Sequence, residues 1–318
     1  MVQTRATGQA CSSIHENSST PYKSDKVPVR RQLLNRCSVR EFLFAYEPTI
    51  RLIAFCGLFA ALAVLEFALP LRKQAIGRGW RWPNNLGVAV VDTLLVRIFF
   101  PTTAIGLAFL AETHGFGFFN AFPVPRWLSV VASVVVLDLA IYLQHVLFHA
   151  VPGLWRLHRM HHSDLEFDVS TGLRFHPIEI LLSMLIKLAV VAAIGAPPLA
   201  FLVFEVLLNG TSIFNHANIR IPGSVDRVLR WFVVTPDMHR VHHSILVRET
   251  NSNFGFNLPW WDRLFGTYRA QPIAGHEAMT IGVEQFRDPR DLRIDRMMLQ
   301  PFLGDVGRYP IGQRDADQ

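Results

Sequence analysis

The sequence contains little cysteine and little charge. Three of its 318 residues are cysteines and 18% are Asp, Glu, Lys or Arg, whereas 50% are hydrophobic. No two cysteines have C-x-x-C spacing, which argues against a thiolate zinc site and a disulfide framework. The basic residues give a formal charge of +6 but form no stripe with interleaved aromatic residues, so nucleic acid is not an expected partner. The mean hydropathy of +0.25 and the clustering of apolar residues indicate a membrane protein.

Four long apolar stretches predict the membrane-embedded part. Residues 52–71, 86–111 and 127–148 are each long enough to cross the bilayer core, which takes about 20 residues. The fourth stretch, 178–208, is too long for one upright span, and a helix is expected to break at Gly195–Pro198 near its middle. The sequence therefore predicts an all-α membrane protein, with a transmembrane helical bundle of about three spans plus a helical hairpin and a cytosolic histidine-rich cap.

The expected organisation has four regions. They are a polar and basic N-terminal tail (1–47), an N-terminal transmembrane region (48–126), a histidine-rich region (127–270) and a C-terminal tail (271–318). Within the N-terminal tail, residues 1–28 have the composition of a disordered segment, and residues 29–47 are either an interfacial amphipathic helix or a solvated basic linker. The nearly uncharged loop 112–126 is expected on the outer side, which places the histidine-rich region on the cytosolic face.

Histidine is concentrated between residues 145 and 243, where ten of the thirteen histidines lie. They form one H-x-x-x-H motif and two H-x-x-H-H motifs, together with two single histidines. Positions i, i+3 and i+4 share one face of a helix, so each motif presents two or three imidazoles together. The candidate metal ligands are His145 and His149, then His158, His161 and His162, then His239, His242 and His243, with His176 and His216 as the single residues.

The number of imidazoles predicts a site for two metal ions. Imidazole is a nitrogen donor suited to iron, zinc and copper, and one ion accepts about four to six ligands. The alternative is ten buried histidines held only by hydrogen bonds. It is unfavourable for the group, because imidazoles are costly to bury without partners and repel one another when protonated. It stays open for His176, which precedes Pro177 and is either a ligand or a structural residue.

Carboxylates near the motifs are candidates for orienting the ligands. A metal-bound imidazole usually donates its other N–H to a carboxylate or a carbonyl. Asp138 lies seven residues before His145, two helical turns back on the same face, in an apolar stretch where a carboxylate is a functional candidate. Asp164, Glu179 and Asp237 lie near other motifs, and for each of them a solvated charge or a helix cap is an equally good interpretation.

In order and spacing, these motifs resemble those of the fatty acid hydroxylase/sterol desaturase superfamily over roughly residues 130–270. The resemblance is carried by Asp138-x₃-Tyr142-x₂-His145-x₃-His149, Leu154-Trp155-x₂-His158-x₂-His161-His162-Ser163, Arg174-Phe175-His176-Pro177-x-Glu179, Phe214-x-His216-Ala217-Asn218, His239-x₂-His242-His243-Ser244 and Asn253-Phe254-Gly255 before Trp261–Thr267. It implies a membrane helical bundle in which residues 127–270 form the catalytic domain, with a cytosol-facing histidine cluster.

The same resemblance implies the reaction and the cofactor. The reaction would be O₂-dependent hydroxylation or desaturation of a lipid such as a sterol or a fatty acyl chain. The cofactor would be a non-haem centre of two iron ions held by the eight motif histidines, with His216 and His176 as additions. Zinc is also compatible with imidazole ligands. No cytochrome b5 module is expected within the 47-residue head, so electrons would come from a separate carrier of cytochrome b5, ferredoxin or reductase type.

Two other classes of protein remain as alternatives. A zinc-dependent membrane hydrolase would have few ligands and an open site, typically with H-E-x-x-H, and the sequence lacks this motif. A non-enzymatic metal-binding or transport protein would bind its ion at mid-membrane on broken helices, whereas these histidines lie at the ends of the spans and in the polar part. The sequence does not distinguish among lipid classes, or hydroxylation from desaturation.

Overall fold

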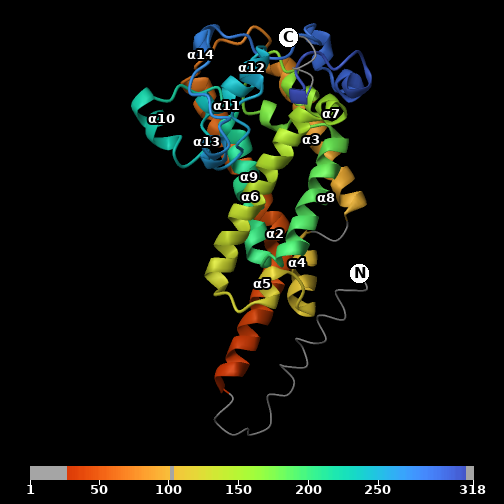
Figure 1. The fold of residues 1–318 in the computed structure, drawn as a ribbon, viewed down its shortest axis with the longest axis vertical. Coiled ribbons are helices and arrows are strands. Elements are labelled where there is room, and N and C mark those ends of the chain that lie inside the picture. Colours follow the sequence, from red (N-terminus) through yellow and green to blue (C-terminus); the bar gives the residue numbers. More distant parts are fainter. Residues whose placement is uncertain (1–26, 101–103, 313–318) are drawn as a thin grey trace. The chain divides into compact units, whose positions relative to one another are not determined.

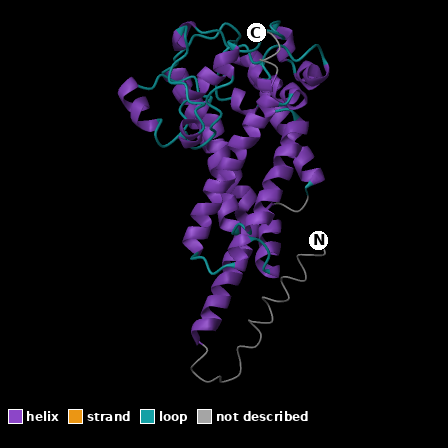
Figure 2. Cartoon of the chain, viewed as in Figure 1, coloured by secondary structure: helices purple, strands orange, loops and turns teal. Residues whose placement is uncertain are grey.

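The computed structural model describes residues 27–100 and 104–312 as helices joined by loops (Figure 1 and Figure 2). These residues contain no strand, only two isolated β-bridges, Pro70–Ile219 and Ser244–Ile281. The all-α prediction is therefore confirmed. The chain divides into two units, Met1–Leu52 and Ile53–Gln318, and the second contains every histidine of the motifs.

The first described helix, α2, runs from Val27 to Ala68. It includes residues 29–47, so this stretch is helical and continuous with the first apolar stretch. The disordered segment expected over residues 1–28 lies outside the described residues except for its last two positions. Within the first unit, Glu47 Oε1 and Arg51 Nη1 form an ion pair of 2.8 Å one turn apart, which supports the helix locally.

Five stretches of the described chain are long and apolar enough to cross a membrane. They are Ala45–Ala68, Arg78–Ala121, Arg126–Ala150, Pro177–Ile194 and Pro198–Asn215, the second of which includes the undescribed residues 101–103. Large apolar side chains on these stretches point outward, and Trp127 and Ile98 are both 69% exposed. Such surfaces suit contact with lipid chains rather than water. The chain is a multi-pass integral membrane protein, as its sequence predicted.

The span expected over residues 86–111 consists of two helices. They are α3 (Arg78–Phe99) and α4 (Ala104–His114), and residues 101–103 between them lie outside the description. Phe100, which directly follows α3, is outside the helical conformation with φ −124° and ψ 66°. Pro101 follows it, and a residue before proline is disfavoured in the helical region. The apolar pattern over 86–111 predicted one continuous span, and the break between α3 and α4 corrects that expectation.

The predicted helical hairpin is confirmed. Its helices are α8 (Pro177–Ile194) and α9 (Pro198–Asn215), joined by the turn that begins at Gly195. Gly195 has φ +64°, and an added Cβ would lie 2.6 Å from Asn120 Nδ2, so glycine suits both the turn and the close contact. The hairpin returns to the end from which it started, with His176 at the start of α8 and His216 at the end of α9.

The helices of the hairpin pack against α6 (Arg126–Ala150) and against α4, and α8 also packs against α3. Lys187 Nζ donates to Glu205 Oε1 at 2.7 Å, which ties α8 to α9 through an ion pair within the membrane-spanning part. Both side chains are buried. Because unpaired charges are expensive there, this pairing keeps the hairpin closed and its outer surface apolar.

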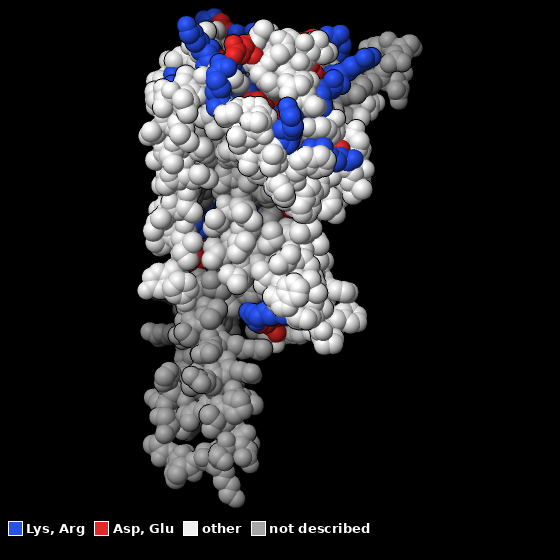
Figure 3. Space-filling model, turned by 90° about the vertical axis from the view of Figure 1, so that its left-hand side faces the viewer, with Lys and Arg blue, Asp and Glu red and all other residues white. Residues whose placement is uncertain are grey.

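Short helices and loops gather at the histidine end of these long helices and form what we call the cap (Figure 1). Charged side chains collect over this end, and the flank of the long helices is mostly uncharged (Figure 3). The helices of the cap are α7 (Pro152–His162), η3 (Thr171–Leu173), α10 (Gly223–Leu229), α11 (Pro236–His242), α12 (Val247–Thr250), α13 (Trp260–Leu264), α14 (Gly275–Ala278), η4 (Pro289–Leu292), α15 (Ile294–Leu299) and η5 (Gln300–Phe302). The remaining short helix, α5 (Phe118–Ala121), precedes α6.

The region expected as a C-terminal tail is folded into the cap as far as residue 312. Tyr309 is fully buried, and its ring stacks on Trp155 with 5.3 Å between centroids. Trp155 Nε1 donates to Val306 O at 3.1 Å. Arg159 Nη2 donates to Gln300 O at 2.5 Å. These contacts hold the C-terminal segment against α7, the helix that carries the first H-x-x-H-H motif.

A buried ion-pair network joins α3 to the loop after α7. The Arg81 guanidinium is fully buried and donates to both Asp164 carboxylate oxygens, at 2.8 and 2.7 Å, and to Asp168. Arg174, also fully buried, donates to Met160 O at 2.9 Å. Although burial opposes ionisation of Asp164, the charges of Arg81 and Arg174 hold its pKa below the usual range. The network fixes the segment that follows His162.

Candidate metal centre

Four helices bring the motif histidines together. α6 carries His145 and His149 near its end, and α7 carries the first H-x-x-H-H motif. α11 carries the second, and the last residue of α9 is followed by His216. Local signals start the two short helices, since Pro152 stands in the first turn of α7 and the Thr235 side chain accepts from Met238 N at 3.3 Å to cap α11.

Nine buried histidines form two groups whose ligand atoms can each surround one ion. Within each group the ligand atoms lie within 4.8 Å of one another. Group A consists of His145, His149, His158, His162 and His242, and group B consists of His161, His216, His239 and His243. The groups are adjacent, because the rings of His162 and His243 stack with 4.6 Å between centroids.

Each H-x-x-H-H motif divides its histidines between the two groups. In α7, positions i and i+4 (His158 and His162) join group A and position i+3 (His161) joins group B. In α11 the assignment is reversed, so that His242 at i+3 is the one that joins group A. Each motif therefore supplies ligands to both groups. The motif in α7 gives two histidines to group A and one to group B, and the motif in α11 gives one to group A and two to group B.

The hydrogen bonds of the rings show where their lone pairs point. His145 Nδ1 lies 2.8 Å from Phe254 O, and His158 Nδ1 lies 2.7 Å from Glu179 Oε1. A backbone carbonyl and an ionised carboxylate only accept, so with Glu179 ionised each Nδ1 carries the proton and each neutral ring keeps an unprotonated Nε2. These two Nε2 atoms face each other at 3.0 Å. Two lone pairs at that distance repel unless a cation lies between them.

Group B shows the same arrangement around His216. Its Nδ1 donates to Ser212 O at 2.7 Å, which leaves Nε2 as a lone pair. The Nε2 atoms of His161, His239 and His243 converge on it at 3.2, 3.1 and 3.1 Å. Two nitrogen ligands about 2.1 Å from one ion lie about 3.0 Å apart when they subtend a right angle, so these spacings fit neighbouring ligands of one ion.

Several buried ring nitrogens lack any hydrogen-bond partner among the described residues. The unpartnered nitrogens that belong to group A are His149 Nε2, His242 Nε2 and both ring nitrogens of His162. Buried polar atoms are nearly always hydrogen-bonded, so such a concentration of unpartnered nitrogens indicates a ligand-binding site. Neutral imidazole is the donor that iron and zinc accept, and the two groups therefore fit two such ions.

Burial keeps the imidazoles neutral and so ready to bind metal. It lowers the pKa of His158 to about 3 and that of His216 to about 4. For His161, His162 and His243, burial and then the neighbouring imidazoles hold the pKa well below its usual value near 6.5. His239 and His242 are shifted in the same direction for the same reasons. Protons therefore compete weakly with a metal at neutral pH.

Most of the oxygens that orient the ligand rings do not belong to the carboxylates predicted from the sequence. Glu179 is one of the predicted carboxylates, and it meets His158 as described above. The others include Asn251 Oδ1, 3.1 Å from His149 Nδ1, and Ser252 O, 2.8 Å from His242 Nδ1. Backbone carbonyls leave no residue-type signal, so sequence reasoning missed them. The need for glycine at position 172 was not predicted either. An added Cβ there would lie 2.5 Å from Ser212 O and 3.0 Å from His216 Nδ1, the two atoms whose hydrogen bond orients the His216 ring.

The other three predicted carboxylates, Asp138, Asp164 and Asp237, contact other parts of the protein rather than ligand rings. Asp138 is buried, and its Oδ2 accepts from Trp261 Nε1 at 2.8 Å and from Leu258 N at 3.3 Å. It therefore anchors the segment after Phe256 instead of a histidine. Asp164 belongs to the Arg81 network, and Asp237 pairs with Arg240 at 2.5 Å within α11.

His176 lies outside both groups. Its Nδ1 accepts from Ile178 N at 3.2 Å, which caps α8, and its Nε2 lies 3.3 Å from Met298 O. Both ring nitrogens are thus occupied by the backbone. The structure brings together nine of the ten predicted histidines and gives His176 a place at the start of a helix.

Two phenylalanines lie across both groups. The Phe175 ring stacks on His161 with 4.3 Å between centroids and is 6.2 Å from His158. The Phe256 ring is 6.0 Å from His145 and 6.1 Å from His239. Each phenylalanine therefore touches one ring of each group, and the two lie 6.4 Å apart. They form an apolar wall beside the site where both ions would lie.

Comparison with known proteins identifies a family model and several relatives. The family model described as fatty acid hydroxylase matches residues 130–267, which contain all nine grouped histidines. Ornithine lipid hydroxylase OlsE of Rhizobium tropici is 28% identical over 242 residues, which cover 72% of this chain and 71% of the relative.

Two animal enzymes match over shorter regions. Cholesterol 25-hydroxylase of Rattus norvegicus is 29% identical, over 49% of this chain and 53% of the relative. Alkylglycerol monooxygenase of Xenopus tropicalis is 31% identical, over 41% of this chain and 28% of the relative. The matches to these two enzymes thus cover about half of the first and under a third of the second. No solved structure matches the chain.

Proposed function

Because this chain belongs to the fatty acid hydroxylase family through residues 130–267, we propose that it hydroxylates a membrane lipid with O₂ at a histidine-ligated di-iron centre. The observation that carries the proposal is the pair of imidazole groups whose unprotonated Nε2 atoms face one another. Group A would hold one iron and group B the other. The ligand atoms of both groups are imidazole nitrogens, which are donors that suit a redox-active ion.

The proposed reaction is R–H + O₂ + 2e⁻ + 2H⁺ → R–OH + H₂O. The bound iron would supply the binding and activation of O₂. The protein's own residues fix the site. Glu179 and the carbonyls of Phe254 and Ser252 hold the protons on Nδ1, so that each Nε2 stays available. The wall of Phe175 and Phe256 keeps water away from the place where a C–H bond would react.

Hydroxylation is favoured over desaturation by the relatives, whose names describe hydroxylases and a monooxygenase. We propose an acyl lipid as the substrate, because the match to the ornithine lipid hydroxylase extends over 72% of this chain, well beyond residues 130–267. The acyl chain would enter from the bilayer alongside α6, α8 and α9, the long helices that end at the two groups.

We propose that the histidine cluster lies on the cytosolic face. The lysine and arginine content of the loops at the two ends of the long helices supports this. Residues 69–77, at the histidine end of α2 and α3, include Arg72 and Lys73. At the far ends, residues 115–125 and the hairpin turn at 195–198 contain no lysine or arginine, and Arg126 at the start of α6 is paired with Glu112. Short loops rich in Lys and Arg stay in the cytosol, so this distribution favours a cytosolic cap. A separate cytosolic electron carrier would then supply the two electrons.

The experiment compares lipids of cells that express the chain or its His161→Ala variant. Under ¹⁸O₂ the cells with the unchanged protein should accumulate a lipid heavier by one ¹⁸O atom, and cells with the variant should not. Ornithine lipid, cholesterol and an alkylglycerol then serve as test substrates for the purified protein. Product that takes its oxygen from water, or forms without O₂, would refute an oxygenase.

A further inference from the structure

A pocket of about 320 Å³ lies in the cap directly behind two ligands of group A. Its lining includes Asn251 and Ser252, the residues whose oxygens accept from His149 Nδ1 and His242 Nδ1. The lining also includes Arg248 and Arg269 but no aspartate or glutamate. The pocket floor is therefore one hydrogen bond from the ligand rings, and its rim is positively charged.

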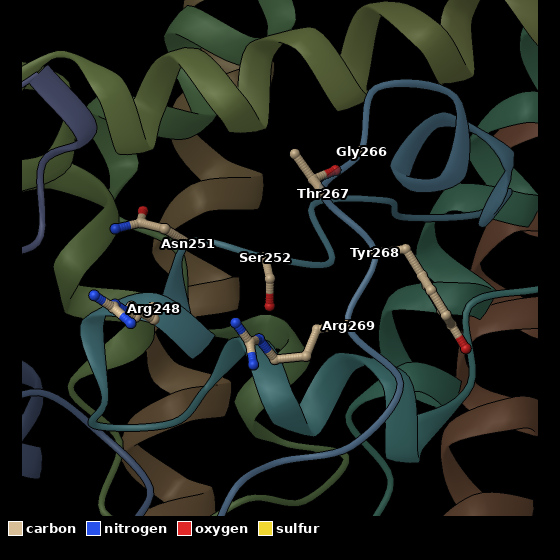
Figure 4. A pocket seen from close by; sticks show the side chains of 7 residues that line it. All are labelled: Arg248, Asn251, Ser252, Gly266, Thr267, Tyr268 and Arg269. Atoms are coloured by element: carbon tan, nitrogen blue, oxygen red, sulfur yellow. The ribbon is translucent and has the colours of Figure 1, made fainter.

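The two arginines are available to an external partner. Arg248 is exposed and Arg269 is partly buried. In the view of Figure 4, the Arg248 side chain lies below Asn251 and the Arg269 side chain lies below Ser252. Among the described residues, neither guanidinium has a hydrogen-bond or ion-pair partner, and Arg269 Nε is buried without one. In contrast, Arg81, Arg159 and Arg240 all donate to protein oxygens. Unpaired guanidinium groups prefer carboxylates or phosphates.

We propose that this pocket is the docking site of a small acidic electron-carrier protein, and that electrons enter group A through Asn251–His149 and Ser252–His242. The inference rests on the proposed function, because only an O₂-dependent reaction needs this supply. Two one-electron carriers would each transfer one electron per turnover, which balances the two electrons in the equation above. Carboxylates around the carrier's redox group would contact Arg248 and Arg269.

The orientation of the ligand rings favours a carrier over the headgroup of the lipid substrate. The pocket meets the rings from the Nδ1 side, whereas the ions would lie on the Nε2 side. The imidazole rings therefore stand between the pocket and the metals. Electrons can cross a ring and its hydrogen bond, but a substrate C–H bond placed in this pocket could not reach the reacting centre.

The test measures how fast the iron-loaded protein in detergent is reduced by a reduced plant-type [2Fe–2S] ferredoxin, an acidic one-electron carrier. At low ionic strength, Arg248→Glu/Arg269→Glu should lower the second-order rate constant by about tenfold or more, because charge complementarity steers association. The deficit should shrink at about 0.5 M salt, where surface charges are screened. Arg248→Lys/Arg269→Lys should stay within a few-fold of the unchanged protein.

Two controls separate docking from damage to the centre. Arg296→Glu reverses an exposed arginine on α15 outside the pocket and should leave the rate unchanged. Photoreduction by a small deazaflavin, which needs no docking surface, should be equally fast in all variants. Equal ferredoxin rates in the Glu variant and the unchanged protein would overturn the proposal. A raised KM for lipid in the deazaflavin-reduced Glu variant would also overturn it, because it would indicate that the pocket binds the lipid headgroup. If deazaflavin-reduced unchanged protein hydroxylates no lipid, the proposed function fails by itself.

Discussion

His145 Nε2 lies 3.0 Å from His158 Nε2, although the Nδ1 atom of each ring already donates its proton to an oxygen. The pair is tolerable only with a cation between the two nitrogens. Because His145 lies in the last two turns of the membrane-spanning helix α6 and His158 lies in the cap helix α7, this one contact joins the membrane part to the cap. Metal binding should therefore stabilise the fold as well as permit catalysis.

Replacing a histidine of group B should remove one ion, whereas replacing His176 should remove none. We expect His161→Ala to lower the iron content from two ions per chain towards one and to abolish turnover, because group B would keep only three imidazoles. His176→Ala should keep both ions and cost about 1 kcal/mol of stability through the lost helix cap. Metal analysis and turnover of the two purified variants check this. Loss of iron from His176→Ala would place that residue among the ligands.

The carboxylate of Glu179 should matter for metal affinity, and that of Asp138 should not. Glu179→Gln removes the charge that His158 Nδ1 meets at 2.7 Å, and we expect about 10- to 100-fold weaker iron binding at group A. Asp138→Asn changes a carboxylate that contacts Trp261 and Leu258, so iron affinity should be nearly unchanged. Competition with a chelator measures both. Equal affinities in the two variants would mean that Glu179 does not tune the ligand.

The metal-free protein should lose stability as the pH falls below about 6.5. Seven grouped histidines outside the spans have a folded-state pKa below that of the unfolded chain, so in this range the unfolded chain binds more protons. Each histidine contributes a loss of up to about 1.4 kcal/mol per pH unit, from pH 6.5 down to its folded pKa, about 4 for His216. Thermal unfolding of the chelator-treated protein at pH 7.5, 6.5 and 5.5 tests this. A midpoint that rises on acidification would show that the cluster is not buried in neutral form.

The Arg81 network should be a principal determinant of cap stability. Arg81→Met leaves the buried carboxylates of Asp164 and Asp168 without their main cation, and we expect destabilisation of about 3–5 kcal/mol. Arg220→Met removes an exposed partner of Glu277 and should change the unfolding midpoint little. Thermal unfolding in detergent compares the two variants. Comparable stability of both would mean that the buried network contributes no more than a surface pair.

The features of this protein that depend on local sequence signals could be predicted from its sequence. The spacing of His158, His161 and His162 on one helix face is a property of the helix itself, so the motif alone indicates a metal site. Gly195 and the two prolines after it likewise determine the hairpin locally. For the same reason, Pro101 would have predicted the break between α3 and α4.

Other features depend on how distant segments meet, which no local pattern encodes. The exchange of roles between the two H-x-x-H-H motifs follows from how α7 and α11 face each other. The carbonyl oxygens of Ser212 and Ser252 carry no side-chain signal. His176 shares the sequence character of a ligand, but its position at the start of α8 directs both nitrogens to the backbone. Its role could be recognised only in three dimensions.

The most direct test of the two-ion site is spectroscopy and metal analysis of anaerobically purified protein. We predict two iron ions per chain, bound by nitrogen ligands and close enough for their spins to couple in the ferric state, with activity proportional to iron content. A fully active preparation with one ion per chain, or with zinc in place of iron, would contradict the account.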